Sequence, residues 1–124
     1  VLARAKRPAL VAAEDVHWNG AGAALEKLAR KLAAPVYVAP YTAVLPISSR
    51  SRCYAGYLPP SREQIAERLA PHDVLFFVGG TGLRTTLYSE ARLAQPKLWI
   101  GNHPGVLAAD GEFELASVAD TSAF

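Results

Sequence analysis

The sequence contains no methionine, and its only cysteine is Cys53. One cysteine cannot form a disulfide within the chain, which is typical of a reducing compartment and favours a cytoplasmic location. No apolar run approaches the ~20 residues that span a bilayer, so we expect no membrane segment. The first residues also do not resemble a signal peptide, because Arg4, Lys6 and Arg7 interrupt them.

The chain also lacks a strong excess of charge of either sign. Its 13 lysines and arginines and 11 aspartates and glutamates leave a formal net charge of +2. Basic residues stand beside acidic ones, as in Glu26-Lys27, and no basic stripe alternates with aromatic residues. Nucleic acid is therefore not an expected partner.

The composition is that of a globular protein with a substantial core. Hydrophobic residues make up 51% of the 124 residues and charged residues 19%. This length suits a single domain over residues 1–124. Residues 1–7 are predicted to be the last turns of a helix, with cations placed favourably for the helix dipole ahead of Pro8. We therefore expect a fragment with a truncated N-terminus.

Short apolar runs alternate with helical patterns along the chain. Strands are predicted at 9–13, 35–39, 74–78, 98–100 and 115–118, and helices at 23–32 and about 61–70. Ser61 and Gln64 have the spacing of a capping box at the start of the second helix. Residues 15–22 and the long segment 40–60, rich in proline, serine and tyrosine, are predicted to be loops.

This order predicts an α/β fold. Strands that are apolar throughout are buried on both faces, and strand, helix and strand within about 30 residues are typical of a right-handed βαβ unit. We expect a doubly wound, Rossmann-like parallel sheet with helices on both faces.

Glycines follow the most apolar predicted strand, in the run Gly79-Gly80-Thr81-Gly82. Backbone N–H groups at such a strand end can bind a phosphate, in which case Arg84 and Asn102 would have to replace the usual phosphate and ribose partners. The run is not the full dinucleotide fingerprint, and no carboxylate follows the next strand. A turn that requires positive φ is the favoured interpretation.

No complete catalytic set can be recognised in the sequence. The spacings of His17, His72 and His103 match no zinc motif, although His103 follows a predicted strand, where ligands bind in such folds. There is no Gly-x-Ser-x-Gly elbow. Glu14 and Asp15 are adjacent and therefore should point to different sides, which makes a poor acid/base pair.

Three stretches carry a resemblance to a known family. They are 7–40, with Arg7-Pro8-Ala9-Leu10-Val11 and Ala34-Pro35-Val36-Tyr37-Val38-Ala39-Pro40; 53–59, Cys53-Tyr54-Ala55-Gly56-Tyr57-Leu58-Pro59; and 72–79, His72-Asp73-Val74-Leu75-Phe76-Phe77-Val78-Gly79. Together they resemble the central domain of thiamine-diphosphate-dependent enzymes, most closely the benzoylformate decarboxylases. The resemblance implies a six-stranded parallel sheet and the middle position among three domains.

The resemblance also implies what the chain does not do alone. In this family thiamine diphosphate and Mg²⁺ bind between the outer domains of neighbouring subunits, and the full-length proteins are often tetramers. The implied function is that of a structural middle domain of a 2-oxo-acid decarboxylase, a lyase, inactive by itself. Its implied partners are the outer domains, and no cofactor is expected in this chain.

Departures from the family pattern leave alternatives open. Benzoylformate decarboxylases have a catalytic histidine in the middle domain, and matching on Gly79 and Arg84 places Thr86 at its position. Some relatives bind ADP or FAD here, so a nucleotide-binding module using Gly79, Gly80, Gly82, Arg84 and Asn102 is the alternative. A free-standing interaction domain that uses the 40–60 segment is a third hypothesis.

Overall fold

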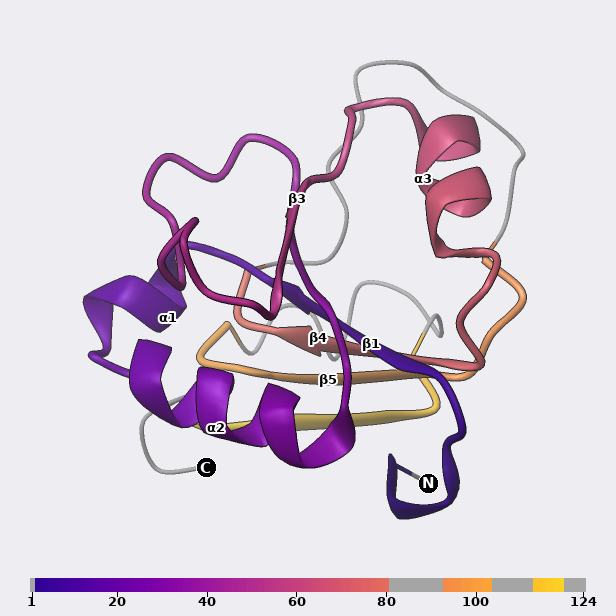
Figure 1. The fold of residues 1–124 in the computed structure, drawn as a ribbon, viewed down its shortest axis with the longest axis horizontal. Helices are drawn as coiled ribbons and strands as arrows, with labels where there is room; N and C mark the ends of the chain where they lie inside the picture. The colour runs from indigo at the N-terminus through magenta and orange to yellow at the C-terminus, as the bar shows by residue number, and fades with distance from the viewer. Residues whose placement is uncertain (1, 81–92, 104–112, 120–124) are drawn as a thin grey trace.

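The strands form one parallel sheet in a computed structural model that describes residues 2–80, 93–103 and 113–119. The strands are ordered β3-β2-β1-β4-β5-β6, and every neighbouring pair is parallel (Figure 1). Their bounds are β1 Pro8–Ala12, β2 Val36–Val38, β3 Tyr54–Tyr57, β4 Val74–Val78, β5 Lys97–Gly101 and β6 Leu115–Val118. This order confirms the predicted doubly wound α/β fold.

Helices cover the two faces of the sheet. The α-helices are α1 Asp15–Trp18, α2 Gly22–Leu32 and α3 Arg62–Leu69. Leu25 and Ala29 of α2 pack in one core cluster, with Leu10 of β1. Ile65 and Leu69 of α3 belong to the other cluster, on the opposite face. Within the described residues, no helix is long and apolar enough to cross a membrane.

The alternation of side chains along the central strands explains why both faces are apolar. Leu10 and Phe76 are register partners and share the α2 face, whereas Val11 and Phe77 share the α3 face. All five residues of β1 and all five of β4 are buried. A continuous apolar run is what a strand buried on both sides requires.

Four local predictions need correction. Residues 15–22, predicted as a loop, begin with the one-turn helix α1. The 40–60 segment contains the edge strand β3, which its partly exposed side chains had hidden. The predicted helix over residues 1–7 is a single 3₁₀ turn, Leu2–Arg4. Ser61 is the N-cap of α3, but its side chain makes no capping hydrogen bond, so the capping box does not form.

The topology places a switch point between β1 and β4. From β1 the chain proceeds outward to β2 and β3, then returns to β4 and continues to β5 and β6 on the other side. Loops at the carboxyl ends of β1 and β4 therefore diverge, which opens a crevice where ligands bind in this class of sheet. Helix α1 follows β1 at this end (Figure 1).

Candidate functional site

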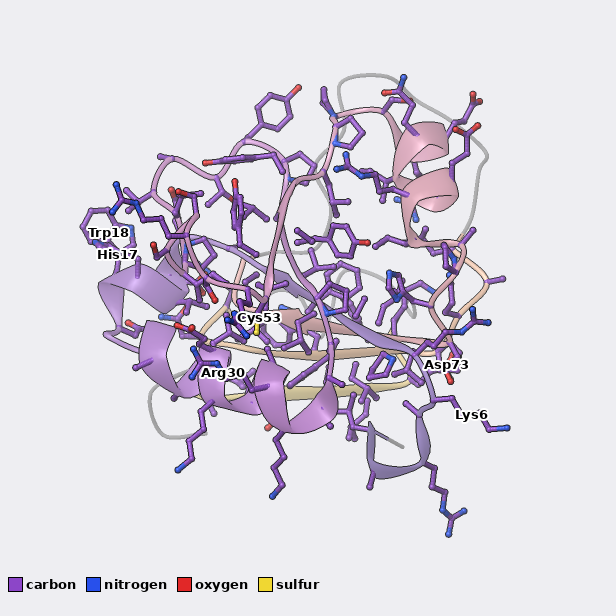
Figure 2. All side chains as sticks on the ribbon, in the orientation of Figure 1. Lys6, His17, Trp18, Arg30, Cys53 and Asp73 are labelled. Carbon is purple, nitrogen blue, oxygen red and sulfur yellow. The ribbon has the colours of Figure 1, made fainter. Side chains whose placement is uncertain are left out.

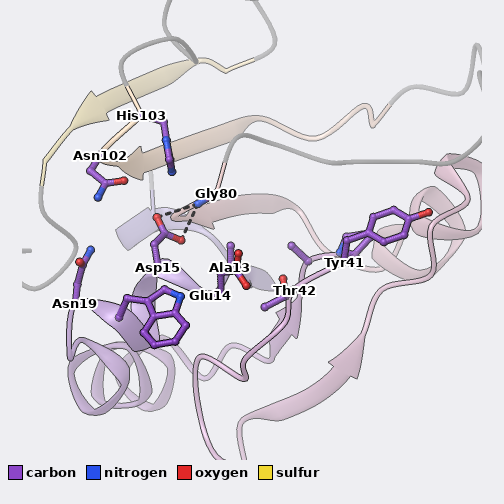
Figure 3. A pocket seen from close by; sticks show the side chains of 12 residues that line it. Ala13, Glu14, Asp15, Asn19, Tyr41, Thr42, Gly80, Asn102 and His103 are labelled. Carbon is purple, nitrogen blue, oxygen red and sulfur yellow. Dashed lines mark hydrogen bonds between the residues drawn. The ribbon is translucent and has the colours of Figure 1, made fainter.

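A cavity of about 380 Å³ lies at the switch point (Figure 3). It is formed at the carboxyl ends of β1, β2, β4 and β5. Its lining residues are Ala13, Glu14, Asp15, Trp18, Asn19, Ala39, Pro40, Tyr41, Thr42, Gly80, Asn102 and His103. The volume is within the range of small-molecule sites.

The Asp15 carboxylate spans the crevice from β1 to β4. Its Oδ1 and Oδ2 accept hydrogen bonds from the Gly80 backbone N–H, with N···O distances of 2.9 and 3.1 Å (Figure 3). Gly79 and Gly80 have φ of +78° and +68°. A Cβ at Gly79 would overlap this carboxylate. Glycine is therefore required there both by backbone conformation and by the close approach of Asp15.

The neighbouring carboxylate of Glu14 accepts a hydrogen bond from a different loop. Its Oε2 accepts a hydrogen bond from the Ala43 backbone N–H at 2.9 Å, which ties the segment after β2 to the end of β1. The two adjacent carboxylates thus bind different backbone segments, although both line the crevice and do not point to opposite sides as predicted. They do not form an acid/base pair.

Aromatic side chains stand at the rim of the crevice. Trp18 is 66% exposed and Tyr41 is 56% exposed. Tyr41 has φ of +62°, which is uncommon for a residue with a side chain. His17 is exposed and packs edge-on against Trp18. Neither Trp18 nor Tyr41 was singled out from the sequence, because an isolated aromatic residue in a segment predicted to be a loop has no distinguishing pattern.

The electrostatics of the crevice do not suit a diphosphate. Its described lining contains two carboxylates and neither lysine nor arginine. Among residues 2–80, 93–103 and 113–119, no group of three histidine, cysteine or acidic side chains could hold a metal ion. The described residues therefore do not fit thiamine diphosphate with Mg²⁺, and we derive no chemical step from them.

The structure brings together only part of the set predicted for a nucleotide. Gly79 and Gly80 directly follow β4, and Gly80 lines the same crevice as Asn102 and the exposed His103, which follow β5. Gly82, Arg84 and Thr86 lie outside the described residues. Asp15, the residue in contact with Gly80, was considered in the sequence only as half of a poor acid/base pair with Glu14. Its position just after the first strand of a doubly wound sheet was the available signal.

His72 and Asp73 lie at the opposite end of the sheet, just before β4, where the amino ends of the strands meet. His72 Nε2 lies 3.0 Å from the Tyr37 hydroxyl, and its Nδ1 lies 3.2 Å from the Arg7 carbonyl oxygen. Asp73 accepts hydrogen bonds from the backbone N–H groups of Lys6 and Arg7, at 2.7 and 3.0 Å. These bonds, that from Lys6 above all, hold the pKa of the Asp73 carboxyl below its usual range.

Comparison with known proteins identifies the family of this chain. The family model described as "Thiamine pyrophosphate enzyme, central domain" matches residues 1–124. The chain belongs to this family. The benzoylformate decarboxylase of Pseudomonas aeruginosa PAO1 is 35% identical over 83 residues, which are 67% of this chain and 16% of that protein.

Solved structures of the same kind superpose closely on this central domain. A thiamine diphosphate-dependent 4-hydroxybenzoylformate decarboxylase of Rhodococcus jostii RHA1 matches with a TM-score of 0.91 and 28% identity, over 98% of this chain and 24% of that one. A putative thiamin diphosphate-dependent enzyme from Mycobacterium smegmatis matches with a TM-score of 0.88 and 25% identity, over 98% and 24%. The chain thus spans about a quarter or less of the length of these relatives.

Proposed function

We propose that this central domain is the structural middle domain of a thiamine-diphosphate-dependent 2-oxo-acid decarboxylase similar to benzoylformate decarboxylase. It is not catalytic alone. The observation that carries the proposal is the full-length family match, together with 35% identity to a benzoylformate decarboxylase over two thirds of the chain. The structural likeness to a 4-hydroxybenzoylformate decarboxylase supports an aromatic 2-oxo acid as the substrate class.

The cofactors belong, on this proposal, to other parts of the full-length protein. Thiamine diphosphate would supply the decarboxylation chemistry, with Mg²⁺ holding its diphosphate. The crevice offers the diphosphate no counter-charge, because its described lining has two carboxylates and neither lysine nor arginine. The partners would be the outer domains of a cytoplasmic homo-oligomer, a tetramer by family resemblance.

The test is an assay of the full-length protein and of residues 1–124 side by side. Carbon dioxide release from benzoylformate, 4-hydroxybenzoylformate and an aliphatic 2-oxo acid is measured with and without thiamine diphosphate and Mg²⁺. We expect turnover of an aromatic substrate only by the full-length protein and only with both cofactors. Turnover of none of these 2-oxo acids by a folded, cofactor-loaded protein would contradict the proposed reaction.

Thr86 is proposed to lie at the rim of the active site of the full-length protein. The basis is its match, through Gly79 and Arg84, to the position of the family's middle-domain histidine. A threonine hydroxyl cannot exchange a proton near neutral pH as imidazole can. We expect Thr86→His and Thr86→Ala to change kcat or KM, with the exposed Ser49→Ala as the control. Unchanged kinetics in both Thr86 variants would exclude the rim position.

A further inference from the structure

The crevice at the switch point already has an anion in it, supplied by the chain itself. In doubly wound folds, ligands bind in the crevice outside the carboxyl ends of the strands at the switch point, and backbone N–H groups of a turn there can bind a phosphate. Here the N–H of Gly80, the second residue after β4, lies in that crevice. Both Asp15 oxygens accept from it, at 2.9 and 3.1 Å.

We propose that Asp15 determines the ligand specificity of the crevice, because its carboxylate occupies the anion position at Gly80 and thereby excludes phosphate-bearing ligands such as nucleoside diphosphates.

Steric fit shows how closely the backbone accommodates this carboxylate. Gly79 and Gly80 both have positive φ, and an added Cβ at Gly79 would overlap Asp15 Oδ1 and crowd its Cγ and Oδ2. The double-glycine turn therefore provides the space in which the Asp15 side chain lies. A phosphate at the same N–H would have to displace a carboxylate that binds Gly80 and lies close against Gly79.

The negative charge of the crevice also disfavours a phosphate, in addition to the place that the Asp15 carboxylate occupies. A phosphate placed in the crevice would meet the carboxylates of Asp15 and Glu14, with no lysine or arginine among the described lining residues to offset them. The negative charges of a phosphate and of these carboxylates would repel one another, and the repulsion is stronger in a partly enclosed site than in open water. Without the Asp15 carboxylate, the same place would present the Gly80 N–H, and Figure 3 shows the side chains of Asn102 and His103 on the neighbouring strand end.

Three variants separate occupancy from charge. Asp15→Ala removes both the carboxylate and its charge. Asp15→Asn removes the charge but keeps an oxygen that can accept from the Gly80 N–H. Glu14→Ala removes one charge from the same crevice without touching Gly80, because Glu14 accepts from Ala43 instead.

Binding of ADP and of inorganic pyrophosphate is measured by calorimetry on the full-length protein saturated with thiamine diphosphate and Mg²⁺. Saturation keeps the probes out of the cofactor's own site. We expect at least tenfold tighter binding of both probes to Asp15→Ala than to the wild type, and less than a threefold change for Asp15→Asn and Glu14→Ala. Tighter binding of ADP but not pyrophosphate to Asp15→Ala would place the gain at the nucleoside and overturn the anion position.

Two further outcomes would overturn the proposal. One is that Asp15→Ala binds the probes no better than the wild type. The other is that Asp15→Asn or Glu14→Ala gains as much as Asp15→Ala, which would make net charge the cause. If Asp15→Ala does not fold, Asp15→Ser takes its place against Asp15→Asn. The measurement is of binding and not of turnover, so its failure leaves the proposed decarboxylase function untouched.

Discussion

At both ends of the sheet, side chains form hydrogen bonds with backbone groups, but the surroundings of these bonds differ. At the amino ends of the strands, Asp73 accepts from the segment ahead of β1, Gln95 donates to the end of α3, and Lys97 donates to the segment just ahead of β5. At the carboxyl ends, Asp15 and Glu14 also bind backbone groups, but there the loops diverge around a cavity. Figure 2 shows Lys6 and Asp73 at one end of the molecule and His17 and Trp18 at the other.

This difference teaches that a carboxylate bound to backbone N–H groups is not in itself a functional signal. Asp73 closes the junction between the chain ahead of β1 and the start of β4, with a backbone bond from Asp73 N–H to the Arg7 carbonyl beside it. Asp15 makes a similar bond at the switch point, where it lines a cavity. Asp15 differs from Asp73 in its position at the switch point of the sheet, and not in the kind of bond that it makes.

Gly79→Ala should produce the largest loss of stability and would show how tightly the carboxyl end is built. The alanine would be strained at φ +78° and would overlap Asp15. We expect the free energy of unfolding in urea to fall by roughly 2–4 kcal/mol. Gly20→Ala is the matched control, because Gly20 has φ +67° but no atom near an added Cβ. Its loss should be about 1 kcal/mol, and equal losses would argue against the role of Asp15.

Lys97→Met tests the amino end in the same way. The Lys97 side chain is buried, and its Nζ donates to the carbonyls of Leu93 and Gln95 at 2.7 and 3.1 Å. Methionine would fill similar space but leave these acceptors without their donor, at a cost of about 1–3 kcal/mol in urea unfolding. Lys31→Met, on an exposed position of α2, is the control. A neutral result for Lys97→Met would mean that water replaces the amine.

Tyr37→Phe should have a smaller effect at the same end. Its hydroxyl lies 3.0 Å from His72 Nε2 in a partly buried contact. Loss of this bond should lower the melting temperature in line with about 1 kcal/mol. Tyr41→Phe, at the exposed rim of the crevice, should leave the melting temperature unchanged. If the two variants melt alike, the Tyr37–His72 bond contributes nothing to stability.

The smallest expected effect is the pH dependence from Asp73. Its pKa is lowered in the folded state, chiefly by the Lys6 N–H, so its contribution is complete above the unfolded-state pKa. It is lost as pH falls below about 4 and through the folded-state pKa. Melting temperatures of the wild type and Asp73→Asn between pH 6 and pH 3 should therefore converge as the pH falls. A constant gap across that range would exclude this linkage.

Prediction from sequence worked best where local pattern and burial agree. The runs ending at Ala12 and Val78 are apolar throughout, so their strands could be placed within one residue. β3 was missed because Tyr54–Tyr57 is an edge strand with partly exposed side chains and a register shift beside β2. Its pairing with β2, and not its composition, makes it a strand.

The candidate site was only partly predictable for a related reason. The positive φ at Gly79 and Gly80 is confirmed, and glycine repeats at a strand end are a local signal. The Asp15–Gly80 contact joins residues 65 positions apart, and no local pattern reports such a pair. Gly82, Arg84 and Thr86 lie outside the described residues, so their proposed roles remain predictions.

By itself, the sequence determined the class of fold, because continuous apolar runs that alternate with amphipathic helical patterns indicate a parallel sheet covered by helices. It also determined the family, through residues spread over the whole chain. Only the tertiary structure decided that the Asp15 carboxylate binds the Gly80 N–H in the crevice. Asp15 reaches Gly80 because β1 and β4 are neighbours at the switch point, and that adjacency is a property of the folded sheet and not of either segment.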